Sequence, residues 1–469
     1  MDTSKLCARR PPPRCRHAVR RVRGTLLTNL RKATLSAAAV GALAVATAVL
    51  PTAAAQAQSP APTARLGSAA TLPAAALANR GTAQVCAGIA HDRCMAEIVT
   101  VAPSSAKPLT TSTPVGYGPA DFAAAYNLPA ASVGAANTIA ILDEGAFPTL
   151  ESDLGTYRAQ YGLPACTTAN GCFKQVNEHG GAPLAAGTTA TQKEFDEEVG
   201  VETTLDVDMA SAACPTCHIL EITVNRDITT SEDQAAEDFG VAMNTAAKLG
   251  ASAASVSYQF DPDATLDLGT AARDFYHPGM AITASSGDGG FEGTPSGWPQ
   301  NLPTVTSVAG TSLFSTPGSG HNGYTETAWD GSGSGCAAEL PPALGQPTAV
   351  AAICGGHRAD ADIAADADPT TGAAIFDDYA PASNQPYGWI TVGGTSESSP
   401  FIAGLYARGG NVAHVEGPNT LYADPSSAFN DVTIGENAPP NSGCGALCTS
   451  GPGWDGPTGL GTPNGLSAF

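Results

Sequence analysis

The sequence predicts an α/β fold, a doubly wound, mostly parallel sheet with helices on both faces. Short apolar segments without polar alternation recur along the chain, and segments with a helical pattern separate them. Unbroken apolar strands are buried on both faces, and strands joined through helices run parallel. The strand candidates are residues 138–142, 218–224, 254–258, 280–286, 305–310 and 389–393.

Three of the helices can be placed from local signals. Ser231 and Gln234 have the spacing of a capping box, and Lys248-Leu249-Gly250 is typical of a helix end, so we predict a helix between these signals. An acidic segment from 194 to 209 also has a helical pattern. An apolar segment from 401 to 406 predicts a helix that follows the last strand candidate.

The chain divides into three regions. A basic region, an apolar run from 33 to 50 and the small residues up to Ala57 predict a secretion signal over residues 1–57. Residues 58–109, rich in Ala, Pro, Ser and Thr, are predicted to be a tail and linker with a short cystine-clipped segment and without a full prosegment. Residues 110–469 are predicted to form one folded domain. We therefore expect a secreted, extracellular monomer without a membrane anchor in its mature form.

Charge excludes two classes of partner. Residues 1–57 hold 10 of the 22 basic side chains and one of the 43 acidic ones, so the remainder carries 12 against 42, a formal charge near −30. Such a surface repels nucleic acids and anionic membranes. It suits a protein that works in acid, where protonated carboxyls no longer repel one another.

Ten of the twelve cysteines remain after the predicted signal and fall into five close pairs. An even number of cysteines in a secreted chain indicates disulfides. The pairs are Cys86 and Cys94, Cys166 and Cys172, Cys214 and Cys217, Cys336 and Cys354, and Cys444 and Cys448.

Ser396 is the candidate nucleophile. It stands in Gly393-Gly394-Thr395-Ser396, between an apolar strand and an apolar helix, with two glycines that permit a tight turn. A serine at a helix N-terminus faces unpaired backbone N–H groups, which stabilise the negative charge of an attacking oxygen or an oxyanion.

Carboxyl groups are the candidate bases for this serine. None of the eight histidines lies in the His-Gly-Thr context that a subtilisin-type serine would require. The acidic segment instead contains Glu202 and Asp206, four residues apart, which places their Cβ atoms about 5–6 Å from each other on one helix face. Spacing alone would also allow Glu198 to pair with Glu202.

Three motifs together resemble the sedolisin family of serine-carboxyl peptidases. They are, in chain order, Glu202-x-x-Leu-Asp206, Ser-Ser-Gly-Asp288-x-Gly and Gly-Gly-Thr-Ser396-x-x-x-Pro. The C-terminal glycine-rich segment that contains Asp455 resembles the calcium site of the same family. The resemblance runs from about Tyr117 to the C-terminus. It implies a subtilisin-like fold, a Ser396–Glu202–Asp206 triad and endopeptidase activity on protein or peptide substrates in acid. It also implies that Asp143 extends the carboxyl network.

The chemistry of these residues leads to the same expectation. Glu202 would accept the Ser396 proton as a general base, with Asp206 orienting it, during formation of an acyl-enzyme. Asp288 would donate a hydrogen bond to the oxyanion, together with the Ser396 backbone N–H. A carboxyl donates only while protonated, so we expect an acid optimum.

One structural calcium ion is the expected cofactor. Calcium prefers carboxylates and main-chain carbonyls from flexible loops. The resemblance implies side-chain ligands from Asp431 and Asp455 and carbonyl ligands from Val432, Gly451 and Gly453.

Two alternatives remain open at this stage. One is a histidine-dependent subtilisin that uses Asp143, Ser396 and a histidine such as His179 or His218. The other is a secreted binding protein that keeps the peptidase scaffold without turnover.

Overall fold

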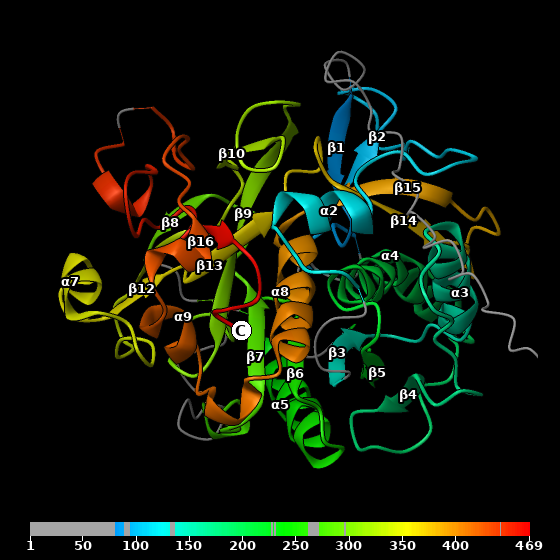
Figure 1. Cartoon of the computed structure of the whole chain (residues 1–469). Coiled ribbons are helices and arrows are strands. Elements are labelled where there is room, and N and C mark those ends of the chain that lie inside the picture. The colour runs from blue at the N-terminus through cyan, green and yellow to red at the C-terminus, as the bar shows by residue number, and fades with distance from the viewer. Residues whose placement is uncertain are drawn as a thin grey trace, which may run out of the picture. The chain divides into compact units, whose positions relative to one another are not determined.

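The structure is a computed structural model, shown in Figure 1. It describes residues 80–88, 94–131, 137–226, 228, 231–260, 272–294, 297–440 and 442–469. The predicted secretion signal, residues 1–57, lies outside the described residues, as does the first part of the predicted tail, residues 58–79.

An eight-stranded sheet forms the centre of the described chain. Its order is β10-β9-β7-β6-β3-β5-β4, and β13 also pairs with β9. All neighbouring strands are parallel except β10, which runs antiparallel to β9. The mostly parallel sheet predicted from the sequence is therefore confirmed. Its strands are β3 (Thr138–Glu144), β4 (Phe173–Asn177), β5 (His218–Val224), β6 (Ala253–Val256), β7 (Ala281–Ser285), β9 (Thr306–Ser315), β10 (Tyr324–Ala328) and β13 (Ile363–Asp366).

Helices cover both faces of this sheet. Side chains alternate between the two faces of a strand, and in β3 Ile139 and Ile141 join the apolar cluster that contains helices α4 (Ala190–Ala213) and α8 (Thr395–Gly409). Ala140 and Leu142 join the opposite cluster, which contains α5 (Glu232–Lys248). Both faces of β3 are thus apolar, which explains why the strand shows no polar alternation.

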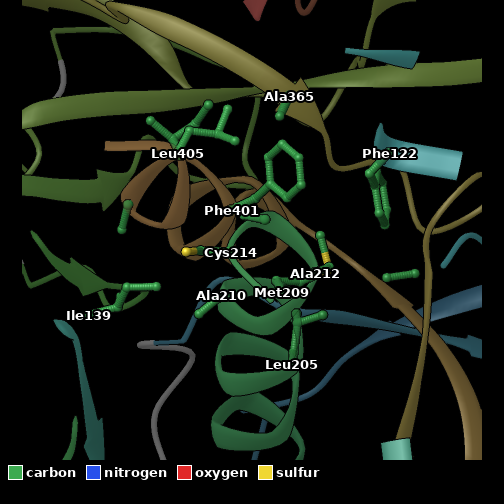
Figure 2. Close-up of a cluster of buried hydrophobic side chains, with 14 of the residues drawn as sticks. Phe122, Ile139, Leu205, Met209, Ala210, Ala212, Cys214, Ala365, Phe401 and Leu405 are labelled. Atoms are coloured by element: carbon green, nitrogen blue, oxygen red, sulfur yellow. The ribbon is translucent and has the colours of Figure 1, made fainter. Parts of the chain in front are cut away.

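α4 and α8 lie side by side, and their contact positions the candidate site (Figure 1). Phe401 and Leu405 of α8 lie next to Leu205 and Met209 of α4 in one buried cluster (Figure 2). Gly404 allows this close approach, because a Cβ there would lie 2.5 Å from the Cβ of Ala213. Core packing therefore fixes α8, which carries the candidate nucleophile, to α4, which carries the candidate base.

Local signals explain how two of the three predicted helices begin. The Ser231 hydroxyl accepts a hydrogen bond from the Gln234 backbone N–H at the start of α5, and the Gln234 side chain bonds to Asp238. α4 has a reciprocal capping box between Thr189 and Gln192. It begins four residues before the predicted acidic segment and ends four residues after it.

A second sheet differs from the sequence-based expectation. Its order is β1-β2-β15-β14, with all pairs antiparallel. Residues 389–393 do form a strand, but it belongs to this sheet and not to the parallel one. Two further strands lie within residues 58–109, which were predicted to be tail and linker. Each of these strands is only four residues long, which is too short to show a hydrophobic pattern in the sequence. The strands are β1 (Gly81–Gln84), β2 (Glu97–Thr100), β14 (Ala373–Asp377) and β15 (Gly388–Gly393).

The remaining elements surround these two sheets. A small sheet of order β12-β11-β8 and a two-stranded ladder of β16 and β17 lie toward the C-terminal part of the chain. The bounds are α2 (Pro119–Ala125), α3 (Leu150–Gln160), α7 (Thr348–Ala351), α9 (Asn419–Ala423), β8 (Phe291–Gly293), β11 (Ser334–Ala337), β12 (Arg358–Asp360), β16 (Phe429–Asn430) and β17 (Thr462–Pro463).

Five disulfides connect the cysteines that are close in sequence. The bonds join Cys86 to Cys94, Cys166 to Cys172, Cys214 to Cys217, Cys336 to Cys354, and Cys444 to Cys448. Each closes a loop of 18 residues or fewer, so the bonds brace local segments and do not join distant parts of the chain.

Candidate active site

Ser396 lies at the start of α8, directly after the turn from β15. Gly394 makes this turn with a φ of 99°, a conformation that side chains other than glycine rarely adopt. Thr395 is the first residue of α8, and Ser396 is the second. The Ser396 side chain is fully buried, and its hydroxyl lies 3.4 Å from the Ser257 carbonyl oxygen. The strand-to-helix placement predicted for this serine is confirmed.

Glu202 and Asp206 lie one turn apart on α4, and both are fully buried. The Ser257 hydroxyl donates a hydrogen bond of 2.9 Å to Oδ1 of Asp206. Burial raises the pKa of Glu202 well above its ordinary value, interaction with the Ser396 hydroxyl lowers it, and the charge of Asp143 raises it. Burial also raises the pKa of Asp206, and the charges of Asp143 and Glu202 raise it further.

Asp143 lies in β3, one residue before its end, and is buried with the pair on α4. Neither of its carboxyl oxygens has a hydrogen-bond partner among the described residues. Burial raises its pKa to about 8. The three carboxyls therefore share one low-dielectric region, where each disfavours the ionisation of the others.

Asp288 approaches the start of α8 from the loop after β7. Its Oδ1 accepts two hydrogen bonds of 2.8 Å, from the backbone N–H and the hydroxyl of Thr395. Its Oδ2 is buried without a partner in the described part of the chain. Burial raises the pKa of Asp288 to about 8, while the bonds from Thr395 lower it. In acid this carboxyl is protonated, and Oδ2 is the oxygen that is free to donate.

The structure brings the four predicted catalytic residues and Asp143 together around one buried point. The Ser396 hydroxyl at the helix N-terminus interacts with the Glu202 carboxyl, and the Asp288 carboxyl is held at the start of the same helix by Thr395. This arrangement can activate an oxygen nucleophile and stabilise a developing oxyanion.

The histidines of the alternative triad do not contact this point. His218 pairs with Thr138 at one end of the β3–β5 ladder, whereas Asp143 pairs with Thr223 at the other end. Five residues of strand separate the two positions, roughly 16 Å. The His179 side chain is 72% exposed and lies 3.6 Å from Glu178. Neither histidine is placed to activate Ser396.

Two supporting residues were missed in the sequence. Ser257 contacts both Asp206 and Ser396 through its hydroxyl and its carbonyl, and Thr395 holds Asp288. Thr395 belongs to the Gly-Thr-Ser motif, so its position was a usable signal. Ser257 directly follows β6 and carries no local signal, because its role depends on tertiary contacts with Asp206 of α4 and Ser396 of α8.

The predicted calcium residues converge on one loop cluster. Oδ2 of Asp431 accepts a hydrogen bond from the Gly453 N–H, and Oδ2 of Asp455 accepts one from the Gly451 N–H. The carbonyl oxygens of Val432, Gly451 and Gly453 accept no hydrogen bond from the described residues. No group of three His, Cys, Asp or Glu side chains suited to a metal occurs in the described ranges. An ion here would rely on two carboxylates and main-chain oxygens, which is a donor set that calcium accepts.

The chain is similar in sequence to two known proteins. No family model matches the chain. Kumamolisin from Bacillus sp. (strain MN-32) is 29% identical over 392 residues, covering 76% of this chain and 63% of kumamolisin. Sedolisin from Pseudomonas sp. (strain 101) is 27% identical over 399 residues, covering 76% of this chain and 62% of sedolisin. The chain thus spans less than two thirds of the length of either relative.

A solved structure shares the fold. It is Pseudomonas sedolisin, described as a serine-carboxyl proteinase complexed with two molecules of pseudo-iodotyrostatin, with a TM-score of 0.57 and 24% identity over 75% of this chain and 96% of that one. The subtilisin-like fold implied by the sequence motifs is thereby confirmed. Two sedolisin-type relatives match three quarters of the sequence and a solved sedolisin shares the fold, so the chain is similar to the sedolisin family.

Proposed function

We propose that the protein is a serine-carboxyl endopeptidase that cleaves protein or peptide substrates in acid. One observation carries this proposal: Ser396, Glu202, Asp206 and Asp288 surround a single buried point that neither His179 nor His218 reaches. The names of the two relatives, kumamolisin and sedolisin, support the same class of activity.

Each residue has a separate role in the proposed reaction. Glu202 accepts the proton of the Ser396 hydroxyl while that oxygen attacks the substrate carbonyl, and it later returns the proton to the leaving amine. Asp206 orients Glu202, while burial and the charge of Asp143 raise the pKa of Glu202, so that its protonated form is readily reached. The Ser396 N–H and the protonated Asp288 stabilise the oxyanion, and water then hydrolyses the acyl-enzyme.

Digestion of a denatured protein tests this function. We expect purified protein to digest it at about pH 3–5, because the buried carboxyls have pKa values above their ordinary value of about 4. Ser396→Ala removes the nucleophile and Glu202→Gln removes the base, so both should abolish digestion. Fragment release followed by mass spectrometry measures the result.

His179→Ala is the matched control, since it changes an exposed histidine and leaves the carboxyls in place. It should digest as well as the unchanged protein. Full activity of Glu202→Gln together with loss in His179→Ala would contradict the proposal and favour a histidine-dependent peptidase. No digestion at any acid pH, with or without calcium, would favour a non-catalytic binding protein.

We also propose that Asp431, Asp455 and the carbonyls of Val432, Gly451 and Gly453 hold one calcium ion. The ion would supply positive charge to two carboxylates, since burial raises the pKa of Asp455 and the charge of Asp431 raises it further. Chelation should lower the melting temperature, because an ion present at a hundred times its Kd stabilises the folded state by about 2.7 kcal/mol. Asp431→Asn should melt at the same temperature with and without chelator. An unchanged melting curve of the parent protein would contradict the site.

The proposed setting is extracellular, with the signal at residues 1–57 removed. The five disulfides favour an oxidising compartment. Within the described ranges, no helix is both long and apolar enough to cross a membrane. The monomeric state remains a prediction, which sedimentation of the purified protein would check.

A further inference from the structure

The residues that follow β6 form a backbone edge beside the candidate active site. The Ser257 carbonyl accepts a hydrogen bond of 3.0 Å from the Met95 N–H, and the Met95 carbonyl accepts one of 2.9 Å from the Ser396 N–H. A Cβ on Gly394 would lie 2.2 Å from the Met95 oxygen and 2.6 Å from Oδ2 of Asp288. The Met95 backbone therefore marks the path of a substrate residue whose carbonyl group is attacked.

The side chain of a residue on this path begins between two segments of the protein. Its backbone N–H lies at Ser257 and its carbonyl group lies beside Asp288, so its Cα lies between them. Gln259 belongs to the first segment, two residues after Ser257, and its side chain reaches the second. A Cβ on Gly287, the residue before Asp288, would lie 3.0 Å from Oε1 of Gln259. The Gln259 amide is therefore beside the start of the substrate side chain.

Two glycines make room for this amide. A Cβ on Gly297 would lie 2.0 Å from Nε2 of Gln259, closer than two unbonded atoms approach. Backbone bonds fix the segment of Gly297, because Phe260 and Trp298 exchange hydrogen bonds of 2.8 and 2.9 Å. The other glycine, Gly287, is bonded to the start of α8 through its N–H. The amide is thus held between two anchored segments, and its position is fixed when a substrate binds.

The same position borders the protein surface. Oε1 of Glu292 lies 3.5 Å from the Cβ position of Gly287 and 3.7 Å from that of Gly289. Glu292 and Gly289 are both exposed. A long, narrow side chain can therefore extend towards the surface, whereas a ring or a branch close to the substrate Cα meets the Gln259 amide.

We propose that Gln259 determines which side chain the enzyme accepts before the cleaved bond, and that it selects unbranched ones. The proposal rests on the peptidase function proposed above and names the substrate class of the same site: proteins with an unbranched side chain, such as methionine, at that position. Aromatic rings and β-branched side chains are excluded because their bulk begins at Cβ or Cγ. An unbranched chain carries only methylene groups there and can bend around the amide. Met95, which takes this path in the structure, is itself unbranched and only 7% exposed.

Three peptides that differ only in the residue before the cleaved bond test the proposal. They carry methionine, phenylalanine or valine there, and kcat/KM is measured at pH 4, with mass spectrometry identifying the cleaved bond. We expect the unchanged protein to show a kcat/KM for the methionine peptide about tenfold or more above the other two, because misfitting carbon groups lower transition-state binding by such factors. Equal values for the three peptides would overturn the proposal.

Gln259→Gly and Gln259→Met form a matched pair of variants. Gln259→Gly removes the obstacle and should raise kcat/KM for the phenylalanine peptide about tenfold or more relative to the methionine peptide. Gln259→Met keeps the bulk and should continue to reject phenylalanine. The ratio of two peptides in one variant cancels any general loss of activity, and thermal melting verifies folding. An unchanged ratio in Gln259→Gly would contradict the role of Gln259.

A parallel digestion of denatured protein separates the two proposals. Cleavage of that protein and of the peptides, without preference among the three residues, would overturn the role of Gln259 and leave the peptidase function standing. Absence of cleavage in both assays would overturn both.

Discussion

Asp288 uses its two carboxyl oxygens differently. Oδ1 accepts both hydrogen bonds from Thr395, so this oxygen fixes the side chain against the start of α8. Oδ2 has no partner among the described residues and adjoins the oxyanion position. Below its pKa of about 8 the carboxyl is protonated and can donate; above it, the ionised group repels an oxyanion.

Asp288→Asn should therefore extend activity toward neutral pH. The asparagine oxygen can accept the bonds from Thr395, and its amide N–H can donate to the oxyanion at every pH. Asp288→Ala loses this donor and should lower kcat/KM by about 10²–10³-fold. Profiles of kcat/KM from pH 3 to 8 measure both effects. Coincident pH limits for the asparagine variant and the unchanged protein would show that Asp288 does not set the limit.

The turn between β15 and α8 is the element that aligns the reacting groups. Gly394 has a φ of 99°, and a Cβ there would overlap the positions of the Met95 oxygen and Asp288 Oδ2. Gly394→Ala should lower kcat/KM about a hundredfold or more and also reduce stability, because the conformation is strained for any side chain. Kinetics and thermal melting check the two effects separately.

Gly162→Ala is the control for strain alone. Gly162 has a φ of 67°, and its added Cβ would meet nothing within 4 Å. It should lose about 1 kcal/mol of stability and keep its activity. Equal activity losses in the two variants would show that strain, and not obstruction of the oxyanion position, is responsible.

The elements predicted from sequence are those whose signals are local. β5 occupies residues 218–224 as predicted, and α5 follows its capping residue Ser231. β1 and β2 were not predicted, because strands of four residues depend on their sheet partners: β2 pairs with β15, almost 300 residues away, and β1 pairs with β2. The same reason explains why Ser257 gave no signal, since its contacts with Asp206 and Ser396 exist only in the folded chain.

Many carboxyl groups are buried in the described part of the molecule. Burial raises the pKa of Asp377 to about 8, and those of Asp208, Glu221 and Asp366 well above their ordinary values. Such groups are protonated in the folded state and ionised in the unfolded state between about pH 4 and the raised value. Their contribution to stability is complete below about pH 4 and is lost as the pH rises through the raised pKa. Repulsion among the many acidic groups grows in the same direction.

The melting temperature should consequently be higher at pH 4 than at pH 7, and Glu221→Gln should reduce the difference. Glu221 is 1% exposed in the central sheet, and an amide of the same shape is neutral at both pH values. We expect the fall in melting temperature between pH 4 and pH 7 to be smaller in this variant by about 2 °C or more. Glu237→Gln, an exposed change on α5, should leave the drop as it is. Equal drops in all three proteins would mean that the buried Glu221 carboxyl does not link folding to pH.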